Sequence, residues 1–459
     1  MRNLAGQRVT VMGLGRFGGG VGVARWLAVQ GARVRVTDQA SAEQLADSLA
    51  ELRDLPIEYR LDGHDEDDFA RADLVVVNPA VPPTSRFLQT ARDAGVPITT
   101  EINLFVERCA AHATIGVSGS VGKSTTTAMI GHVLERCLPQ RRVRVGGNLG
   151  RSLLDELPEI APQDVVVLEL SSFQLERTPL VGWSPQVAVL TNLLPNHLDW
   201  HGSFDDYIAA KFNLVRFQRP RDAFVIAAEC AAEARRRLGA DRRLCTVALD
   251  ARQQPLLSDG VASKAIDGCD VGELPLPGRH NRLNAAFAVA VARSLGVSAT
   301  SAAAAVTEFR GLPHRLQCVC ERDGVRYFDD SKSTTPEATV TALQAFDAEQ
   351  PILLILGGYD KGIDLSAAVE HAARRCRFVA TVGQTGGAIH AQLRQRGVPS
   401  GYFERFADAV GACVQRAEPG CVVLLSPACA SWGAFRDFRE RGKLFERLVQ
   451  APGAVATPA

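Results

Sequence analysis

Three segments of this chain run from a β-branched strand through a glycine-rich turn into a helical pattern. The first opens at residue 8 and the second at 114, and strands near 318–328, 352–358 and 421–427 belong to the third. This order is typical of parallel sheets covered by helices on both faces. The sequence therefore predicts an α/β protein of three domains: a Rossmann-like domain at 1–107, a central parallel-sheet domain of P-loop ATPase type at 108–311, and a second Rossmann-like domain at 312–459.

Length and charge narrow the classes of partner. The 459 residues suit about three domains at roughly 150 residues each. Because 51 basic residues balance 51 acidic ones, the chain has no strong field for nucleic acid or an anionic membrane. No segment offers ~18 consecutive apolar residues, and the eleven cysteines include no CxxC pair, which favours reduced thiols. We expect a cytoplasmic monomer that acts on small molecules.

A phosphate-binding loop is predicted between the strand and the helix of the central domain. It contains Gly119, Ser120 and Gly122, followed by Lys123 and Ser124. Backbone N–H groups and the helix dipole favour an anion at this place, the lysine suits ATP phosphates, and the serine hydroxyl suits Mg²⁺. The usual spacing asks for glycine at 117, where this chain has valine, with glycine at 116 instead.

The N-terminal glycine loop, Gly13-x-Gly15-x-x-Gly18, is followed twenty residues later by Asp38 at the end of the next strand. This spacing fits a nicotinamide cofactor, another nucleotide, or packing alone. Two further glycines, at 19 and 20, would loosen the start of the following helix, which is less usual for a dinucleotide site. A UDP-sugar satisfies the same geometry.

Polar residues follow two strands of the central domain. Glu169 ends one predicted strand, and Asn192 ends the next and leads to His197. Ligands of parallel sheets bind at the carboxyl ends of strands, so Glu169 is placed to hold a second Mg²⁺ and His197 is a candidate metal or substrate contact. Lys211, taken alone, reads as a solvated lysine on a helix.

Eight ordered motifs resemble the Mur ligases, in the branch that adds D-glutamate. They are GVSGSVGKST at 116–125, GGNLG at 146–150, ELSSFQLE at 169–176, YIAAK at 207–211, GRHNRLNA at 278–285, GLPHR at 311–315, DDSKST at 329–334 and SPACASWGAFRDFRERG at 426–442. The resemblance covers nearly the whole chain. It implies ATP-dependent ligation of D-glutamate to UDP-N-acetylmuramoyl-L-alanine through an acyl phosphate, with ATP and two Mg²⁺ ions, for peptidoglycan precursor synthesis.

The resemblance also implies roles for individual residues. Catalysis is expected of Lys123, His197 and Lys211. ATP is expected at Gly119, Ser120, Gly122, Lys123, Ser124, Thr125, Asn281, Asn284, Arg315 and Asp330. The UDP precursor is expected at Gly15, Arg16, Phe17, Asp38, Gln39, Asn148, Ser171 and Gln174, and glutamate at Lys332, Thr334, Lys361, Ser431 and Phe438. The metal ligands are expected to be Ser124, Glu169, His197 and a carbamylated Lys211.

Several residues differ from the usual family pattern, and other functions stay open. Thr335 and Gly433 replace asparagine and aspartate near the expected glutamate site, so a ligase that adds L-glutamate is an alternative. A glutamate ligase acting on another carrier is a second alternative. A nicotinamide-dependent dehydrogenase would use the first glycine loop but leave Lys123 and Glu169 without a role, and a regulatory P-loop NTPase would hydrolyse ATP without an acceptor.

Overall fold

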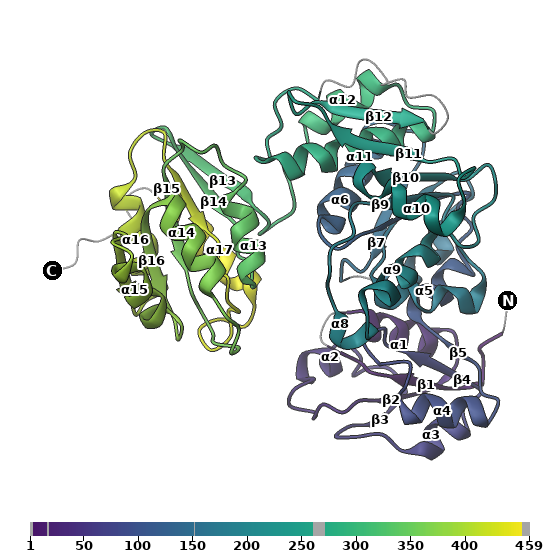
Figure 1. Cartoon of the computed structure of the whole chain (residues 1–459). Coiled ribbons are helices and arrows are strands. Elements are labelled where there is room, and N and C mark those ends of the chain that lie inside the picture. Colours follow the sequence, from purple (N-terminus) through teal and green to yellow (C-terminus); the bar gives the residue numbers. More distant parts are fainter. Residues whose placement is uncertain (1–2, 16–17, 151, 260–270, 452–459) are drawn as a thin grey trace. The chain divides into compact units, whose positions relative to one another are not determined.

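The computed structural model of the protein describes residues 3–15, 18–150, 152–259 and 271–451. The chain divides into two compact units, one of Met1–Val271 with Leu283–Val306 and one of Gly272–Arg282 with Thr307–Ala459. The described residues form three sheets, of five, seven and six strands. The expected α/β class with three parallel-sheet domains is thereby confirmed (Figure 1). The expected boundaries at 107 and 311 stay predictions.

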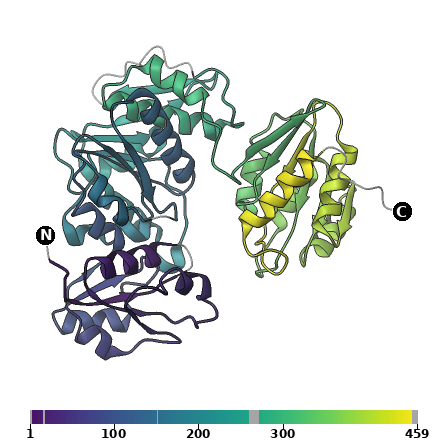
Figure 2. The ribbon, with the colours of Figure 1, turned by 180° about the vertical axis from the view of Figure 1, so that it is seen from behind.

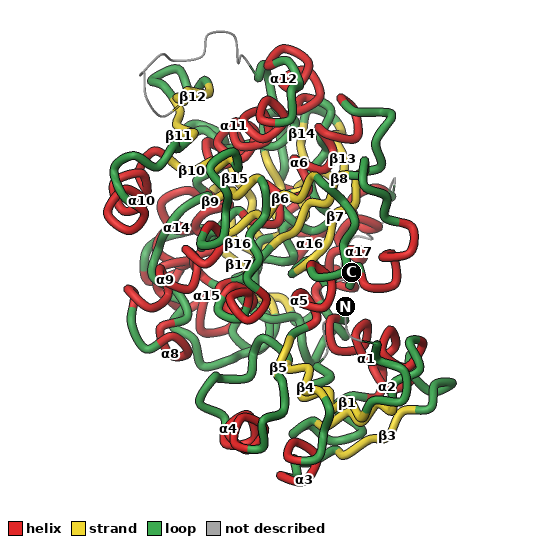
Figure 3. The backbone as a smooth tube through the Cα atoms, turned by 90° about the vertical axis from the view of Figure 1, so that its right-hand side faces the viewer, coloured by secondary structure: helices red, strands yellow, loops and turns green. Residues whose placement is uncertain are grey.

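The N-terminal sheet is parallel throughout, in the order β3-β2-β1-β4-β5. Helices α3 and α4 cover one face, where Phe69 and Leu88 pack on Val75, and α1 and α2 lie on the other (Figures 1 and 3). Helix α1 begins at Gly19, so the extra glycines do not delay the helix. The elements are β1 (Arg8–Met12), α1 (Gly19–Val29), β2 (Arg33–Thr37), α2 (Ala46–Ala50), β3 (Ile57–Arg60), α3 (Glu66–Ala70), β4 (Leu74–Val77), α4 (Arg86–Asp93), β5 (Ile98–Thr99) and α5 (Glu101–Val106).

The central sheet has the order β12-β11-β10-β9-β6-β8-β7, and only β12 runs antiparallel to its neighbour. Strands β8 and β9 are wholly buried, as expected for a sheet covered on both faces. The elements are β6 (Ala113–Ser118), α6 (Lys123–Cys137), β7 (Val143–Gly147), η1 (Leu154–Glu159), β8 (Val165–Glu169), α7 (Ser172–Leu175), η2 (Thr178–Val181), β9 (Val187–Leu190), α8 (Leu198–His201), α9 (Phe204–Phe212), η3 (Asn213–Val215), β10 (Ala223–Ala227), η4 (Ala228–Cys230), α10 (Ala231–Leu238), β11 (Cys245–Leu249), β12 (Pro255–Asp259), α11 (Arg279–Ser294) and α12 (Ala299–Thr307).

The third sheet has the order β13-β14-β18-β15-β16-β17, with β13 antiparallel at one edge. Helices α16 and α17 pack on one face through Val410 and Phe445, while α13, α14 and α15 supply Leu343, Val369 and Ile389 to the other core (Figure 2). The elements are β13 (Gln317–Arg322), β14 (Val325–Asp329), α13 (Pro336–Leu343), β15 (Ile352–Leu356), α14 (Ser366–Arg375), β16 (Cys376–Val382), α15 (Gly386–Gln395), β17 (Ser400–Phe403), α16 (Phe406–Arg416), β18 (Val422–Leu425) and α17 (Phe438–Gln450).

Two further features bear on the class of protein. Within the described ranges, no helix combines the length and apolar character needed to cross a bilayer. The ten cysteines that the structure describes are all free. Neither feature locates a site.

Candidate functional site

The phosphate loop joins the end of β6 to the start of α6. Gly122 caps the helix in a left-handed conformation (φ 83°) and Gly119 has φ 149°. A Cβ on Gly119 would lie 2.0 Å from Thr191 Oγ1, so only glycine lets the loop approach the end of β9. Gly116 is instead a packing residue inside β6, where a Cβ would lie 2.8 Å from Pro185 Cγ. Gly116, the glycine that stands one residue away from the usual spacing, is therefore required for packing of the sheet and is not part of the phosphate loop.

Side chains from two other elements brace this loop. Asn192 Oδ1 accepts hydrogen bonds from the backbone N–H groups of Ser120 (3.0 Å) and Val121 (2.9 Å), and its Nδ2 donates to the Val121 carbonyl (3.0 Å). Tyr207 Oη donates to Ser120 Oγ at 2.9 Å. The sequence singled out Asn192 as a strand end but missed Tyr207. Its spacing of four residues before Lys211, on one face of a helix, is the signal that would have found it.

Residues at the start of α6 provide the groups expected to meet ATP. Lys123 Nζ donates to the carbonyls of Gly119 and Ser120, each at 3.0 Å. Ser124 is buried in the first turn and Thr125 is half-buried beside it. One turn on, Thr126 Oγ1 donates to the Oδ1 atom of Asn284, at 2.9 Å. The structure thus brings Asn284 beside the phosphate loop, and its assignment to ATP stays a prediction.

Glu169 ends β8 with its side chain buried. Its Oε1 accepts a hydrogen bond from Asn148 Nδ2 at 2.8 Å, whereas Oε2 is buried with no hydrogen-bond partner among the described residues. A carboxylate oxygen without a partner is costly unless something positive fills the place. Asn148 and Glu169 therefore lie together, and one carboxylate oxygen remains for a cation.

Lys211 is only 2% exposed, so the interpretation of this residue as a solvated helix lysine is wrong. It lies on α9 one turn after Tyr207, between the buried Ala210 and Phe212. Its Nζ donates to the Gly119 carbonyl at 2.7 Å. Burial, and then the charge of Lys123, lower the pKa of Lys211 to about 6. At neutral pH this lysine is therefore an uncharged amine.

His197 caps α8 in a left-handed conformation (φ 54°) that residues other than glycine seldom adopt. Its ring packs at 4.8 Å from the ring of Phe173, which follows the strand end at Glu169. Partial burial lowers the pKa of His197, and the charge of Lys123 lowers it further. These effects favour the neutral imidazole, which is the form that binds a metal.

The N-terminal glycine loop is closed by Asp38. Its Oδ2 accepts from the N–H groups of Leu14 (2.8 Å) and Gly15 (3.2 Å), and its Oδ1 accepts from that of Ala40 (2.9 Å). A nicotinamide site would need such a carboxylate for the ribose. Here the carboxylate of Asp38 holds the loop itself. Gln39 next to it is exposed, while the predicted residues Arg16 and Phe17 lie outside the described residues.

Ser171 and Gln174 form a capping box at the start of α7. Gln174 N donates to Ser171 Oγ at 3.2 Å, and Ser171 N donates to Gln174 Oε1 at 3.0 Å. Both side chains are buried directly after Glu169. The structure therefore places them beside the strand end and gives them a structural role as well.

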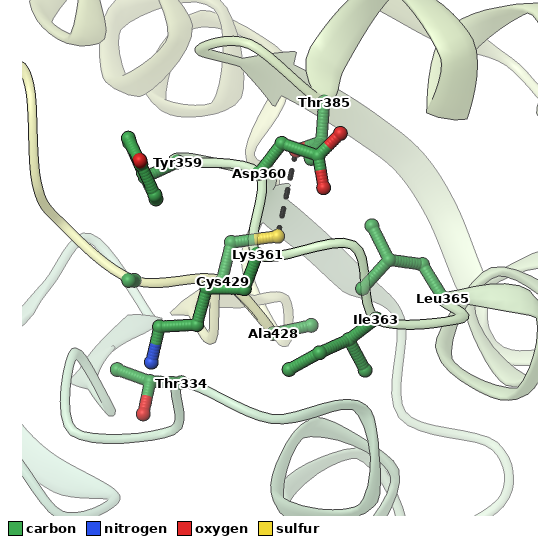
Figure 4. A pocket seen from close by; sticks show the side chains of 10 residues that line it. Thr334, Tyr359, Asp360, Lys361, Ile363, Leu365, Thr385, Ala428 and Cys429 are labelled. Carbon is green, nitrogen blue, oxygen red and sulfur yellow. Dashed lines mark hydrogen bonds between the residues drawn. The ribbon is translucent and has the colours of Figure 1, made fainter.

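The second compact unit holds a separate pocket. Its lining includes Thr334 and Lys361, two of the residues predicted for glutamate (Figure 4). Lys332 Nζ lies 3.9 Å from the ring centroid of Phe438, at the start of α17. The fifth predicted residue, Ser431, is buried directly after the lining residue Ala430. These residues come from three loops at the carboxyl ends of β14, β15 and β18.

Asp330 and Arg441 hold these loops together. Burial raises the pKa of Asp330 to about 7, and its two oxygens accept from Leu316 N (3.1 Å) and Ser426 Oγ (2.8 Å). The Arg441 side chain, 2% exposed, donates to Ser331 Oγ and O at 2.9 Å and to the Cys429 carbonyl at 3.2 Å. Sequence reasoning missed Arg441, because its partner Ser331 lies 110 residues away in the sequence.

The remaining predicted residues of this unit lie apart from the pocket lining. Asn281 is buried on α11, where its Nδ2 donates to the Pro277 carbonyl at 2.8 Å. Arg315 is half-buried and follows His314, whose Nδ1 is 2.6 Å from Asp329 Oδ2. The assignment of Asn281 and Arg315 to ATP stays a prediction.

Comparison with known proteins identifies the family. The profile of the Mur ligase MurD-like N-terminal domain matches residues 7–100, that of the Mur ligase middle domain 117–292, and that of the Mur ligase glutamate ligase domain 314–429. The UDP-N-acetylmuramoylalanine--D-glutamate ligase of Roseiflexus sp. (strain RS-1) is 41% identical, over 98% of this chain and 99% of the relative. The chain belongs to the Mur ligase family.

Other relatives of this Mur ligase agree with that assignment. The enzyme of the same name from Symbiobacterium thermophilum is 38% identical over 97% of this chain and 98% of its own. The crystal structure of UDP-N-acetylmuramate-alanine ligase from Thermotoga maritima aligns with a TM-score of 0.60 over 97% of this chain and 99% of that chain, at 22% identity. The structural likeness supports the fold, and the sequence likeness supports the family.

Proposed function

We propose that this Mur ligase joins D-glutamate to UDP-N-acetylmuramoyl-L-alanine at the expense of ATP, giving ADP and phosphate. The relatives at 38–41% identity carry that substrate in their names. The observation that carries the chemistry is the cluster at the carboxyl ends of β6, β8 and β9. It combines a braced phosphate loop, a carboxylate oxygen without a partner and a buried neutral lysine.

The Mg²⁺ that the family implies fits this cluster. The described part of the chain has no group of three or more His, Cys, Asp and Glu side chains that could hold a metal. Glu169 and His197 would therefore need the Ser124 hydroxyl and a carbamate on Lys211 to complete an oxygen-rich ligand set. A neutral amine is the form that reacts with carbon dioxide, and the low pKa of Lys211 provides it. Two Mg²⁺ ions would neutralise phosphate charge.

The alanyl carboxylate of the UDP precursor is a poor electrophile, so it must be activated before the glutamate amine can attack it. The loop N–H groups and Lys123 would hold the ATP phosphates while the alanyl carboxylate attacks the γ-phosphorus in line. The resulting acyl phosphate would react with the glutamate amine, releasing phosphate. We assign adenine to Asn281 and Asn284, and further nucleotide contacts to Thr125, Arg315 and Asp330.

Substrate contacts complete the assignment. We assign the UDP precursor to the residues predicted for it, namely Gly15, Arg16, Phe17, Asp38, Gln39, Asn148, Ser171 and Gln174. We assign glutamate to Lys332, Thr334, Lys361, Ser431 and Phe438, because the pocket in Figure 4 carries cationic and hydroxyl groups suited to carboxylates.

Product mass tests the proposal. The purified protein with ATP, Mg²⁺, the UDP precursor and D-glutamate should yield a product heavier by one glutamyl residue, with one ADP formed per product. A Lys123→Ala variant is the matched control and should give neither. ADP formation without any new UDP product would contradict the ligase and favour the regulatory NTPase.

We also propose that the protein is a cytoplasmic monomer. Free thiols at the ten described cysteines suit a reducing compartment. Sedimentation of the purified protein and fractionation of the source cells would check both points, and a disulfide-linked or sedimenting dimer would contradict them.

A further inference from the structure

Lys361 is held at the pocket by an aromatic ring. Its Nζ lies 4.6 Å from the ring centroid of Trp432. In Figure 4 the lysine side chain extends toward Thr334, which lines the same pocket. The tryptophan is 50% exposed, among the largest exposures of apolar side chains in the described chain. A ring so exposed contributes little to the core, so packing does not explain its place.

The aromatic partner of Lys361, Trp432, carries no net charge, and no carboxylate of the described residues neutralises the lysine. Asp360 is adjacent in sequence, but its carboxylate accepts a hydrogen bond from Gly362 N at 2.8 Å and points away from the lysine amine (Figure 4). Among the described ion pairs, none involves Lys361. An aromatic face attracts an ammonium group without cancelling its charge. Lys361 is thus fixed in place while its charge remains available to an incoming carboxylate.

The ring of Trp432 is itself fixed by the loop that carries Lys361. Tyr359 packs edge-on against it, with ring centroids 5.6 Å apart. Tyr359 N donates to the Ala430 carbonyl at 2.9 Å, which pairs the two loops by their backbones. Gly433 follows with φ 83°, a turn that a residue with a side chain adopts at a cost. The backbone pairing and the turn together set the ring beside the lysine.

We infer that Trp432 is a positioning residue for glutamate binding, acting by holding the ammonium group of the pocket-lining Lys361 over its ring. This inference rests on the proposed function, because it assumes that Lys361 receives a carboxylate of glutamate. The same segment supplies a second aromatic face, Phe438, to Lys332 at 3.9 Å. Lys332 and Lys361 are therefore held in the same manner. Of the two rings, the exposed Trp432 is the one that can be removed without disturbing the core.

Steady-state kinetics of Trp432→Leu and Trp432→Phe test the inference. An exposed contact between a cation and a ring predicts that the leucine variant raises the KM for D-glutamate about 2- to 5-fold. The kcat and the KM for ATP should stay unchanged, and phenylalanine should restore most of the loss. Tyr402→Leu is the matched control, since Tyr402 is 47% exposed in the same unit and lies outside the pocket lining. Thermal unfolding would verify that all three variants fold.

The outcomes separate this inference from the proposed function. A wild-type protein without glutamate-dependent phosphate release would overturn the proposed function. An active wild type with an unchanged KM for D-glutamate in Trp432→Leu would overturn only the inference. A fall in kcat shared with the Tyr402 control, or no recovery with phenylalanine, would also overturn it.

Discussion

Replacing Lys211 with methionine should make the protein more stable and inactive. The lysine is 2% exposed, and its pKa falls from 10.5 to about 6. Keeping the amine neutral at pH 7, when the unfolded chain would protonate it, costs about 5 kcal/mol. Methionine has a similar volume and no charge, but it forfeits the hydrogen bond to Gly119, which costs about 1–3 kcal/mol. We expect a net gain in unfolding free energy of about 2 kcal/mol or more.

The pH dependence identifies the cause of that gain. Between pH 6 and 10.5 the unfolded wild type binds a proton at this site that the folded protein does not bind, so wild-type stability rises with pH by about 1.4 kcal/mol per unit. The advantage of Lys211→Met should therefore shrink by about 3 kcal/mol between pH 7 and pH 9.

Urea unfolding at both pH values, in buffer free of carbon dioxide so that the lysine stays an amine, measures this change. Ligase activity should be lost in the variant because no carbamate can form. A variant less stable than wild type at pH 7, a pH-independent difference, or retained activity would refute the reasoning.

Three further predictions concern other buried groups. Glu169→Gln should raise the Mg²⁺ concentration for half-maximal phosphate release at least about 10-fold, and an unchanged requirement would exclude Glu169 as a ligand. Asp330 loses its proton near pH 7 when folded and near 3.8 when unfolded, so wild-type stability should fall by about 1.4 kcal/mol per unit across that window. Asp330→Asn should remove this slope in urea unfolding, and an unchanged slope would contradict the assignment. Arg441→Met should lower the unfolding free energy by about 3 kcal/mol or more, since it leaves the Ser331 and Cys429 carbonyls without their donors. Arg439→Met, at an exposed position, is the control. An equal loss of stability in both variants would contradict the role of Arg441 in holding the loops together.

Strand ends were the part of the site that sequence could predict. The apolar runs 165–168 and 187–190 lie in strands, and the polar residues Glu169 and Asn192 at their ends could be predicted because parallel strands end at one edge of the sheet. The phosphate loop was found by its glycines and lysine although its spacing is irregular. Glycine stands at 116, one residue before the usual position, because a side chain there would collide with Pro185. This contact between distant residues cannot be predicted from a local sequence pattern.

Burial and side-chain partners were harder to predict. Lys211 looked solvated because lysine is rarely buried, yet the spacing of Tyr207 and Lys211 places both on the inward face of α9. The contacts of Trp432 with Lys361 and of Arg441 with Ser331 join segments that are far apart in sequence. Only the tertiary fold brings such residues together, so hydrophobic periodicity and motif spacing carry no signal for them.

The most direct test of the proposed function is phosphate release from ATP and Mg²⁺ with UDP-N-acetylmuramoyl-L-alanine, compared for D-glutamate, L-glutamate and no acceptor. The account predicts release with D-glutamate and little with either alternative. Equal or faster release with L-glutamate would contradict the assigned specificity, and release without any acceptor would contradict the ligase itself.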